Sequence, residues 1–125
     1  MLLNKYFTIR ERREDETGSN FLISLNPDHQ VYQGHFPGDP ICPGVCSIQM
    51  IRECAEIVLG QRLTIGTVSQ CRFMELLTPS KNKDLLLKLT LSKAEEGMVK
   101  AVASILSDDA QTSFLEYKGE YSPQC

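Results

Sequence analysis

A histidine in a stiff loop is the residue of this sequence whose type and setting point most directly to chemistry. His35 lies in the segment 34–45, which contains three prolines and three glycines. Proline restricts the backbone and glycine lets a ligand approach it closely, so both suit a rigid binding site better than a core. Because an imidazole changes protonation near neutral pH, His35 is a candidate base.

Apolar residues recur at helical spacing directly after this loop and predict one helix of about 15 residues, with Gly60 as its C-terminal stop. On one face of that helix the spacing of three and four residues groups Gln49, Arg52, Glu53 and Glu56. Spacing alone favours two ordinary side-chain pairs, Gln49 with Glu53 and Arg52 with Glu56, on a partly exposed or dimer-facing surface. Each such pair contributes about 0.2–0.5 kcal/mol.

The remainder of the chain predicts antiparallel strands around this helix. Alternating apolar and polar residues place the strands at 6–9, 21–25, 68–73, 85–91, 98–106 and 115–121. The charged stretch 11–19 separates the first two, and 96–97 and 108–110 are turns. We therefore expect an α+β domain, residues 1–125, in which the sheet wraps around the single helix.

Composition excludes several classes of function. The net charge of −3 and the pI near 5.4 argue against a general binder of nucleic acid or of membrane surfaces. No segment approaches the roughly 20 apolar residues of a membrane span, and the start lacks a signal-peptide core. The five cysteines form an odd set without zinc-type pairs, so we expect reduced thiols, a cytoplasmic protein and no metal.

Two cysteines flank the predicted helix start, where the pKa of a thiol can be lowered. Cys42 and Cys46 therefore raise the hypothesis of a Cys–His nucleophile or a metal site with His35. A C-x-x-x-C spacing with one histidine leaves a zinc site short of ligands. Packing in the core is the better interpretation of both thiols.

The loop and its flanks resemble the β-hydroxyacyl-acyl carrier protein dehydratases of fatty-acid synthesis, which adopt the hot-dog fold. The resemblance covers nearly the whole chain. It is carried by Asn26, Tyr32-Gln33-Gly34, His35-Phe36-Pro37-Gly38, Pro40 and Pro43-Gly44-Val45, and more weakly by Arg72-Phe73, Pro79, Lys93 and Asp108. It implies a helix inside a curled sheet, a dimer paired sheet to sheet, an active site at the dimer interface beside an acyl tunnel, and no cofactor.

The resemblance also implies roles for individual residues. His35 would take the α-proton of a 3-hydroxyacyl thioester while a carboxylic acid helps the 3-hydroxyl leave as water. The thioester oxygen would bind backbone N–H groups at the helix N-terminus, where the dipole favours negative charge. The donors would be Gly44, Val45 and Cys46, and the residues in contact with the acyl group would be Phe36, Pro43, Ile48 and Phe73.

The sequence departs from the family pattern at the acid, because the position fourteen residues after the histidine holds Gln49. Glutamine donates no useful proton, although it can hydrogen-bond a hydroxyl or a water. One turn further on, where the family often has glutamine, this chain has Glu53. Since a turn is about 5.4 Å, Glu53 would act as the acid only if the substrate or the helix shifts, or if a water relays the proton.

Three functions follow from these residues. The leading one is a hydro-lyase, a 3-hydroxyacyl thioester dehydratase-like protein of fatty-acid or related lipid synthesis. The second is an acyl-thioester hydrolase on the same fold, in which Gln49 orients a water or the thioester carbonyl and Glu53 or His35 acts as base. The third is a non-catalytic acyl-binding subunit of a heterodimeric dehydratase. The expected partners are an acyl thioester on acyl carrier protein or coenzyme A and a second copy of the chain, as a homodimer or an oligomer of dimers.

Overall fold

The computed structural model of the chain describes residues 2–30, 41–79 and 81–123, and in these residues one helix accompanies one antiparallel sheet. The helix is α1, Gly44–Leu59. A short 3₁₀ turn, η2, spans Glu95–Gly97. The strands are β1 Phe7–Asp15, β2 Gly18–Leu25, β3 Leu63–Phe73, β4 Asp84–Lys93, β5 Val99–Ser107 and β6 Ser113–Pro123.

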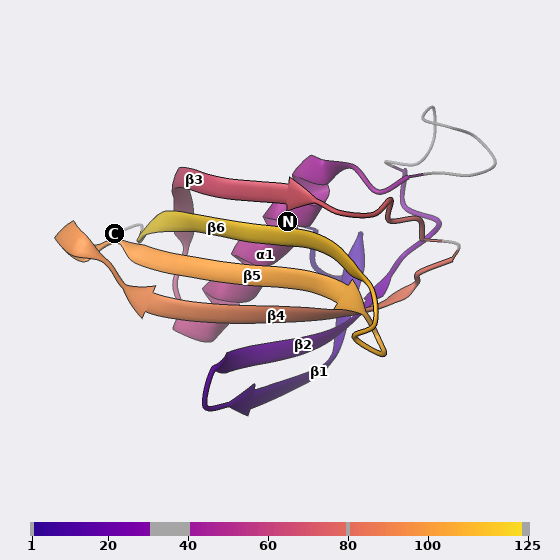
Figure 1. Ribbon diagram of the computed structural model, residues 1–125, viewed down its shortest axis with the longest axis horizontal. Coiled ribbons are helices and arrows are strands. Elements are labelled where there is room, and N and C mark those ends of the chain that lie inside the picture. Colours follow the sequence, from indigo (N-terminus) through magenta and orange to yellow (C-terminus); the bar gives the residue numbers. More distant parts are fainter. Residues whose placement is uncertain (1, 31–40, 80, 124–125) are drawn as a thin grey trace.

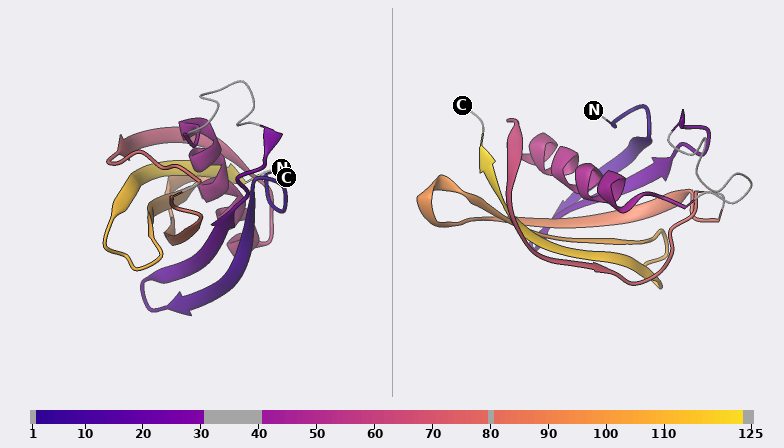
Figure 2. Two further views of the ribbon diagram at one scale, coloured as in Figure 1. Left: turned by 90° about the vertical axis from the view of Figure 1, so that its right-hand side faces the viewer. Right: turned by 90° about the horizontal axis from the view of Figure 1, so that it is seen from above.

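The six strands are ordered β1-β2-β4-β5-β6-β3, so β1 and β3 form the two edges. All five neighbouring pairs are antiparallel. Seen from above, the sheet is curved and α1 lies across its concave side (Figure 2). The ribbon in Figure 1 shows the same helix behind β3, β6 and β5. The prediction of a hot-dog fold, a sheet wrapped around one helix, is confirmed.

Alternation along the strands explains why the sheet packs on the helix. In β4, Leu85, Leu87 and Leu89 are buried while the residues between them are not. Because successive side chains of a strand point to opposite faces, this pattern buries one face of the sheet only. From the helix, the apolar residues Met50, Ile51, Cys54 and Ala55 complete the core.

The predicted helix boundaries are confirmed at both ends. Pro43 is the N-cap, and its side chain makes no capping hydrogen bond. Gly60 ends the helix in the left-handed conformation, with φ of 66°, and its N–H donates to the carbonyl of Glu56 at 2.8 Å. Glycine is favoured at this position because a β-carbon makes the left-handed conformation costly.

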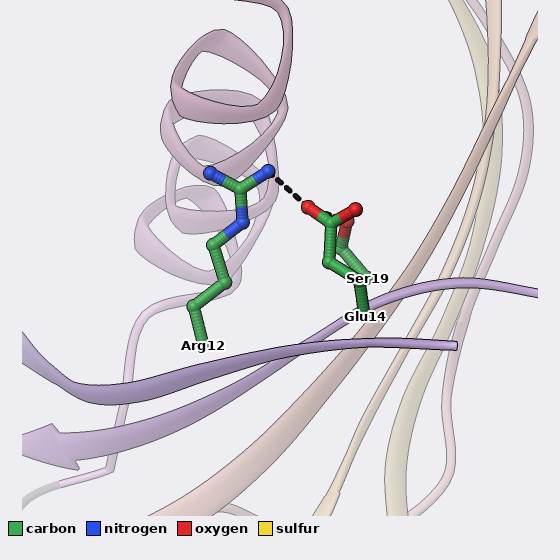
Figure 3. A network of polar contacts seen from close by, with 3 residues as sticks. All are labelled: Arg12, Glu14 and Ser19. Atoms are coloured by element: carbon green, nitrogen blue, oxygen red, sulfur yellow. Dashed lines mark hydrogen bonds and ion pairs between the residues drawn. The ribbon is translucent and has the colours of Figure 1, made fainter.

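The first hairpin is longer than the sequence pattern predicts. The stretch 11–19 is not a separate loop, because β1 continues to Asp15 and β2 begins at Gly18. Residues 11–17 at this edge of the sheet are exposed, so charged residues can form strand without burying charge. Arg12 forms an ion pair with Glu14, and the Ser19 hydroxyl lies 3.4 Å from the same carboxylate (Figure 3).

The other edge strand is also longer than predicted. β3 starts at Leu63, five residues before the predicted start, and pairs with β6 down to Pro123. Thr64 to Val68 are exposed and therefore lack the alternation that identifies a half-buried strand. Hydrogen bonding to β6, rather than burial, makes this segment a strand.

Gly18 tests the contact between the first hairpin and β4. A β-carbon at this position would lie 2.3 Å from the carbonyl oxygen of Leu89, so Gly18→Ala forces two strands apart. We expect a loss of about 2–3 kcal/mol in the free energy of unfolding, measured by urea denaturation. Gly60→Ala is the control, because it has open space around it and should lose only about 1 kcal/mol. Equal losses would contradict the proposed clash.

Candidate functional site

Two predicted site residues meet at the start of α1. A β-carbon added to Gly44 would lie 2.7 Å from Cζ of Phe73, so the ring at the end of β3 rests directly on the first turn of the helix. Both residues line a pocket of about 140 Å³, together with Cys42, Ser47 and Phe114. Phe73 is nevertheless 57% exposed, so its ring forms the outer wall of this pocket.

The backbone amides of this turn are not equivalent. The N–H groups of Cys46 and Ser47 both donate to the carbonyl of Pro43, at 3.1 and 3.3 Å. In the described part of the chain, no backbone carbonyl accepts a hydrogen bond from Gly44 or Val45. The first amides of a helix have no partner within it and carry the positive end of the dipole. Gly44 and Val45 are therefore better placed than Cys46 to bind an oxyanion.

The predicted pair between Gln49 and Glu53 is confirmed, with 3.1 Å between Nε2 and Oε2. The expected surface location is wrong for Glu53, which is only 1% exposed. Its carboxylate also accepts the backbone N–H of Leu2, at 3.1 and 2.9 Å to the two oxygens, and that of Leu3 at 3.0 Å. These donors satisfy a charge that would be costly to bury alone.

The predicted Arg52–Glu56 pair is replaced by contacts with the backbone of Leu63. Arg52 donates to the Leu63 carbonyl at 3.3 Å, and the Glu56 carboxylate accepts the Leu63 N–H at 2.9 Å. Together they bind the first residue of β3 to the helix. They also line an open pocket of about 530 Å³ with Glu53, Ile57 and Arg62.

The two cysteines at the helix start pack in the core, as predicted, since Cys42 and Cys46 are both buried. Burial, followed by the proximity of Cys42, raises the pKa of the Cys46 thiol. Further along the helix, burial and the nearby Glu53 raise the pKa of Cys54 to about 12. A thiol nucleophile needs a lowered pKa, so the hypothesis of a Cys–His nucleophile gains no support here.

The remaining predicted residues are placed as follows. His35 and Phe36 lie outside the described residues. Pro43 caps the helix, and Ile48 is half-buried and packs against the core. The structure thus brings Gly44 to Phe73 and Gln49 to Glu53. The sequence analysis missed the Leu2 and Leu3 amides, because a backbone donor has no side-chain signature in a sequence.

The described residues form a hot-dog fold, and comparison with known proteins identifies the family. The model of the ApeI-like family, described as ApeI dehydratase, matches residues 11–111. The chain belongs to this family. Among the described residues, no helix has the length and apolar character needed to cross a bilayer.

Similar proteins are also dehydratases. The chain is 26% identical to the 3-hydroxyacyl-[acyl-carrier-protein] dehydratase FabZ of Levilactobacillus brevis, over 84% of this chain and 78% of that protein. It is 30% identical to FabZ of Latilactobacillus sakei, over 76% of this chain and 71% of that protein. A solved structure, the dehydratase heterocomplex ApeI:P from Xenorhabdus doucetiae, has the same fold, with a TM-score of 0.68, 20% identity and coverage of 91% of this chain and 96% of that chain.

The raised thiol pKa values give a direct test of the cysteine assignment. Since the thiolate is the reactive form, Cys46 and Cys54 should be alkylated by iodoacetamide near neutral pH at least about tenfold more slowly in the folded protein than in urea. Peptide mapping by mass spectrometry measures both rates. Faster labelling of Cys46 in the folded protein would instead indicate an activated nucleophile.

Proposed function

We propose that the protein dehydrates 3-hydroxyacyl thioesters carried by an acyl carrier protein, in fatty-acid or related lipid synthesis. The observation that carries this proposal is the family match over residues 11–111, which takes in both the histidine loop and the helix. The named relatives act on the same class of substrate. The Gly44 and Val45 amides at the start of α1, which donate to no backbone carbonyl among the described residues, would form the oxyanion site that the reaction requires.

The proposed reaction needs no cofactor. His35 removes the α-proton of the substrate, and the charge that develops on the thioester oxygen is stabilised by the amides of Gly44 and Val45. The bond between the β-carbon and its hydroxyl then breaks as the double bond forms. Gln49 lies about 6 Å along the helix from Val45, at a rise of about 1.5 Å per residue, and holds the departing hydroxyl by a hydrogen bond.

In the proposed reaction, the proton for the leaving hydroxyl comes from His35. Because the amide of Gln49 has no acidic proton, the imidazolium of His35 passes on the proton that it took from the α-carbon. The products are a 2-enoyl thioester and water, and the histidine returns to its neutral form. The contacts of Glu53 favour an anchoring role over that of the acid, since its partners among the described residues are all donors.

The first test uses the reverse reaction, with a medium-chain trans-2-enoyl thioester on acyl carrier protein. The wild-type protein should add one water to the intact thioester, and His35→Ala should lose this activity, as read by mass spectrometry. Release of the carrier thiol would contradict the proposal and assign a thioester hydrolase.

The substitution Gln49→Glu tests the role of Gln49 in binding the departing hydroxyl. Gln49→Glu places a second carboxyl against Glu53, and two close carboxyls share one proton because both cannot readily ionise. This proton provides a carboxylic acid at the position where the wild-type chain has only an amide. Dehydration should therefore become faster, by up to roughly the 10²–10⁴-fold that a general acid contributes. The gain should fade as the pH rises and the shared proton is lost. An unchanged rate in a folded variant would contradict a missing acid.

We propose that the active form is a homodimer paired through β3. This strand is a sheet edge, and its exposed apolar residues include Ile65, Val68 and Phe73, at 38%, 43% and 57%. An exposed apolar edge is typical of a strand that pairs with another chain. Residues 1–125 would form one domain of this cytoplasmic dimer.

A charge on this edge should disrupt the dimer. Val68→Lys is expected to shift the protein to monomers in sedimentation equilibrium, because pairing would bury the ammonium without a partner. Thr8→Lys, exposed on the opposite edge strand β1, is the matched control and should leave the association unchanged. A monomeric wild-type protein, or a dimeric Val68→Lys, would contradict pairing through β3.

A second candidate is an acyl-binding subunit that is active only beside a different partner. The vacant acid position at Gln49 favours it, and the structure of similar fold from Xenorhabdus doucetiae is a heterocomplex. In the enoyl thioester test, this candidate predicts unchanged substrate with the isolated chain. Water addition by the isolated chain would exclude it.

A further inference from the structure

The contact between Glu53 and the beginning of the chain is not used in the reaction proposed above. Glu53 lies at the middle of α1 and is almost completely buried. Its two oxygens accept hydrogen bonds from the backbone N–H groups of Leu2 and Leu3 and from the side-chain amide of Gln49, at 2.9–3.1 Å. Among the described residues, every partner of this carboxylate is a donor, so Glu53 accepts hydrogen bonds from two segments that lie about fifty residues apart.

The first residues fold into a tight turn that presents their amides to the helix. The carbonyl of Leu2 accepts the N–H groups of Lys5 and Tyr6, at 3.0 and 2.7 Å. Asn4 has a left-handed φ of 68°, and its N–H donates to the Phe7 carbonyl at 2.6 Å. With these groups paired inside the turn, the Leu2 and Leu3 amides point outward and meet Glu53. We call residues 2–6 the N-terminal turn.

The N-terminal turn is also bound to the segment that precedes the histidine loop. The backbone N–H of Asn26 donates to the Tyr6 carbonyl, and its side chain donates to the Lys5 carbonyl, both at 2.8 Å. The rings of Tyr6 and His29 meet edge to face, 5.5 Å between centroids. The turn therefore joins the helix face that bears Gln49 to the chain that leads into His35.

The contact fixes the orientation of Gln49. A carboxylate can accept a hydrogen bond but not donate one, so the nitrogen of the Gln49 amide must face Glu53. The amide is planar, and holding one N–H leaves its carbonyl oxygen and second N–H for a ligand in a defined direction. Because this hydrogen bond already restricts the rotation of the Gln49 side chain, less conformational entropy is lost when substrate binds.

We propose that Glu53 is a positioning residue: held by the N-terminal turn, it fixes the amide of Gln49 in the orientation that contacts the substrate's 3-hydroxyl. This inference rests on the proposed function only for the identity of that ligand. The burial, the four contacts and the orientation of Gln49 stand without it.

The test compares Glu53→Gln with Glu56→Gln, a matched change one turn along the helix that affects only the contact with Leu63. With a 3-hydroxyacyl carrier-protein substrate, Glu53→Gln should lower kcat on the order of 10- to 100-fold with little change in KM, and Glu56→Gln should keep kcat. In a Gln49→Ala background, Glu53→Gln should cause no further loss, because the orientation it controls is gone. Multiplying losses would overturn the proposal.

A spectroscopic readout separates this inference from the proposed function. In the ¹⁵N NMR spectrum, the side-chain NH₂ of Gln49 should give two well-separated, slowly exchanging proton signals that collapse in Glu53→Gln and persist in Glu56→Gln. Identical Gln49 signals in wild type and Glu53→Gln would overturn the positioning role. If these signals behave as expected but the wild type converts no substrate, the proposed function fails and the contact stands. If Glu53→Gln does not fold, Glu53→Asp replaces it, since the shorter side chain withdraws from Gln49, and the same signals should collapse.

Discussion

The central constraint on this structure is that the buried carboxylate of Glu53 needs hydrogen-bond donors. Glu53 is 1% exposed in the centre of the helix, and a charge so placed is tolerated only when hydrogen-bond donors surround it. The donors come from Leu2 and Leu3 at the start of the chain and from Gln49 on the preceding turn. The N-terminal turn, the buried helix and the side chain of Gln49 are thus joined through the contacts of one carboxylate.

The side of α1 opposite Glu53 packs against the sheet through apolar residues. Met50, Cys54 and Ala55 face the curved sheet, while Arg52 and Glu56 bind the first residue of β3 by its backbone. The helix is consequently fixed in rotation by polar contacts on one face and by the core on the other. The first turn of α1, where Gly44 lies against the ring of Phe73, is held in place by these contacts. A rigid helix end is what electrostatic stabilisation of an oxyanion requires.

Much of this organisation could be predicted from the sequence, and the errors have physical reasons. The helix and its Gly60 cap follow from apolar spacing, and β4 follows from the alternation of its leucines. The charged half of the first hairpin and the beginning of β3 were missed, because edge strands are held by hydrogen bonds and need not bury alternate residues. The helical spacing predicts a surface position for Glu53, because a charged side chain on a helix face is usually solvated. Besides Gln49, its donors are the backbone amides of Leu2 and Leu3, which no spacing rule within the helix can reveal.

The most direct test of this account is a crystal structure of the protein with a non-hydrolysable 3-hydroxyacyl pantetheine amide. The account predicts that the carbonyl oxygen binds the Gly44 and Val45 amides, that the α-carbon faces His35, and that the 3-hydroxyl lies within hydrogen-bond distance of Gln49. Glu53 should remain bound to Leu2 and Leu3. A 3-hydroxyl bound to Glu53 with the N-terminal turn displaced would contradict it, and would return the role of acid to that carboxyl group.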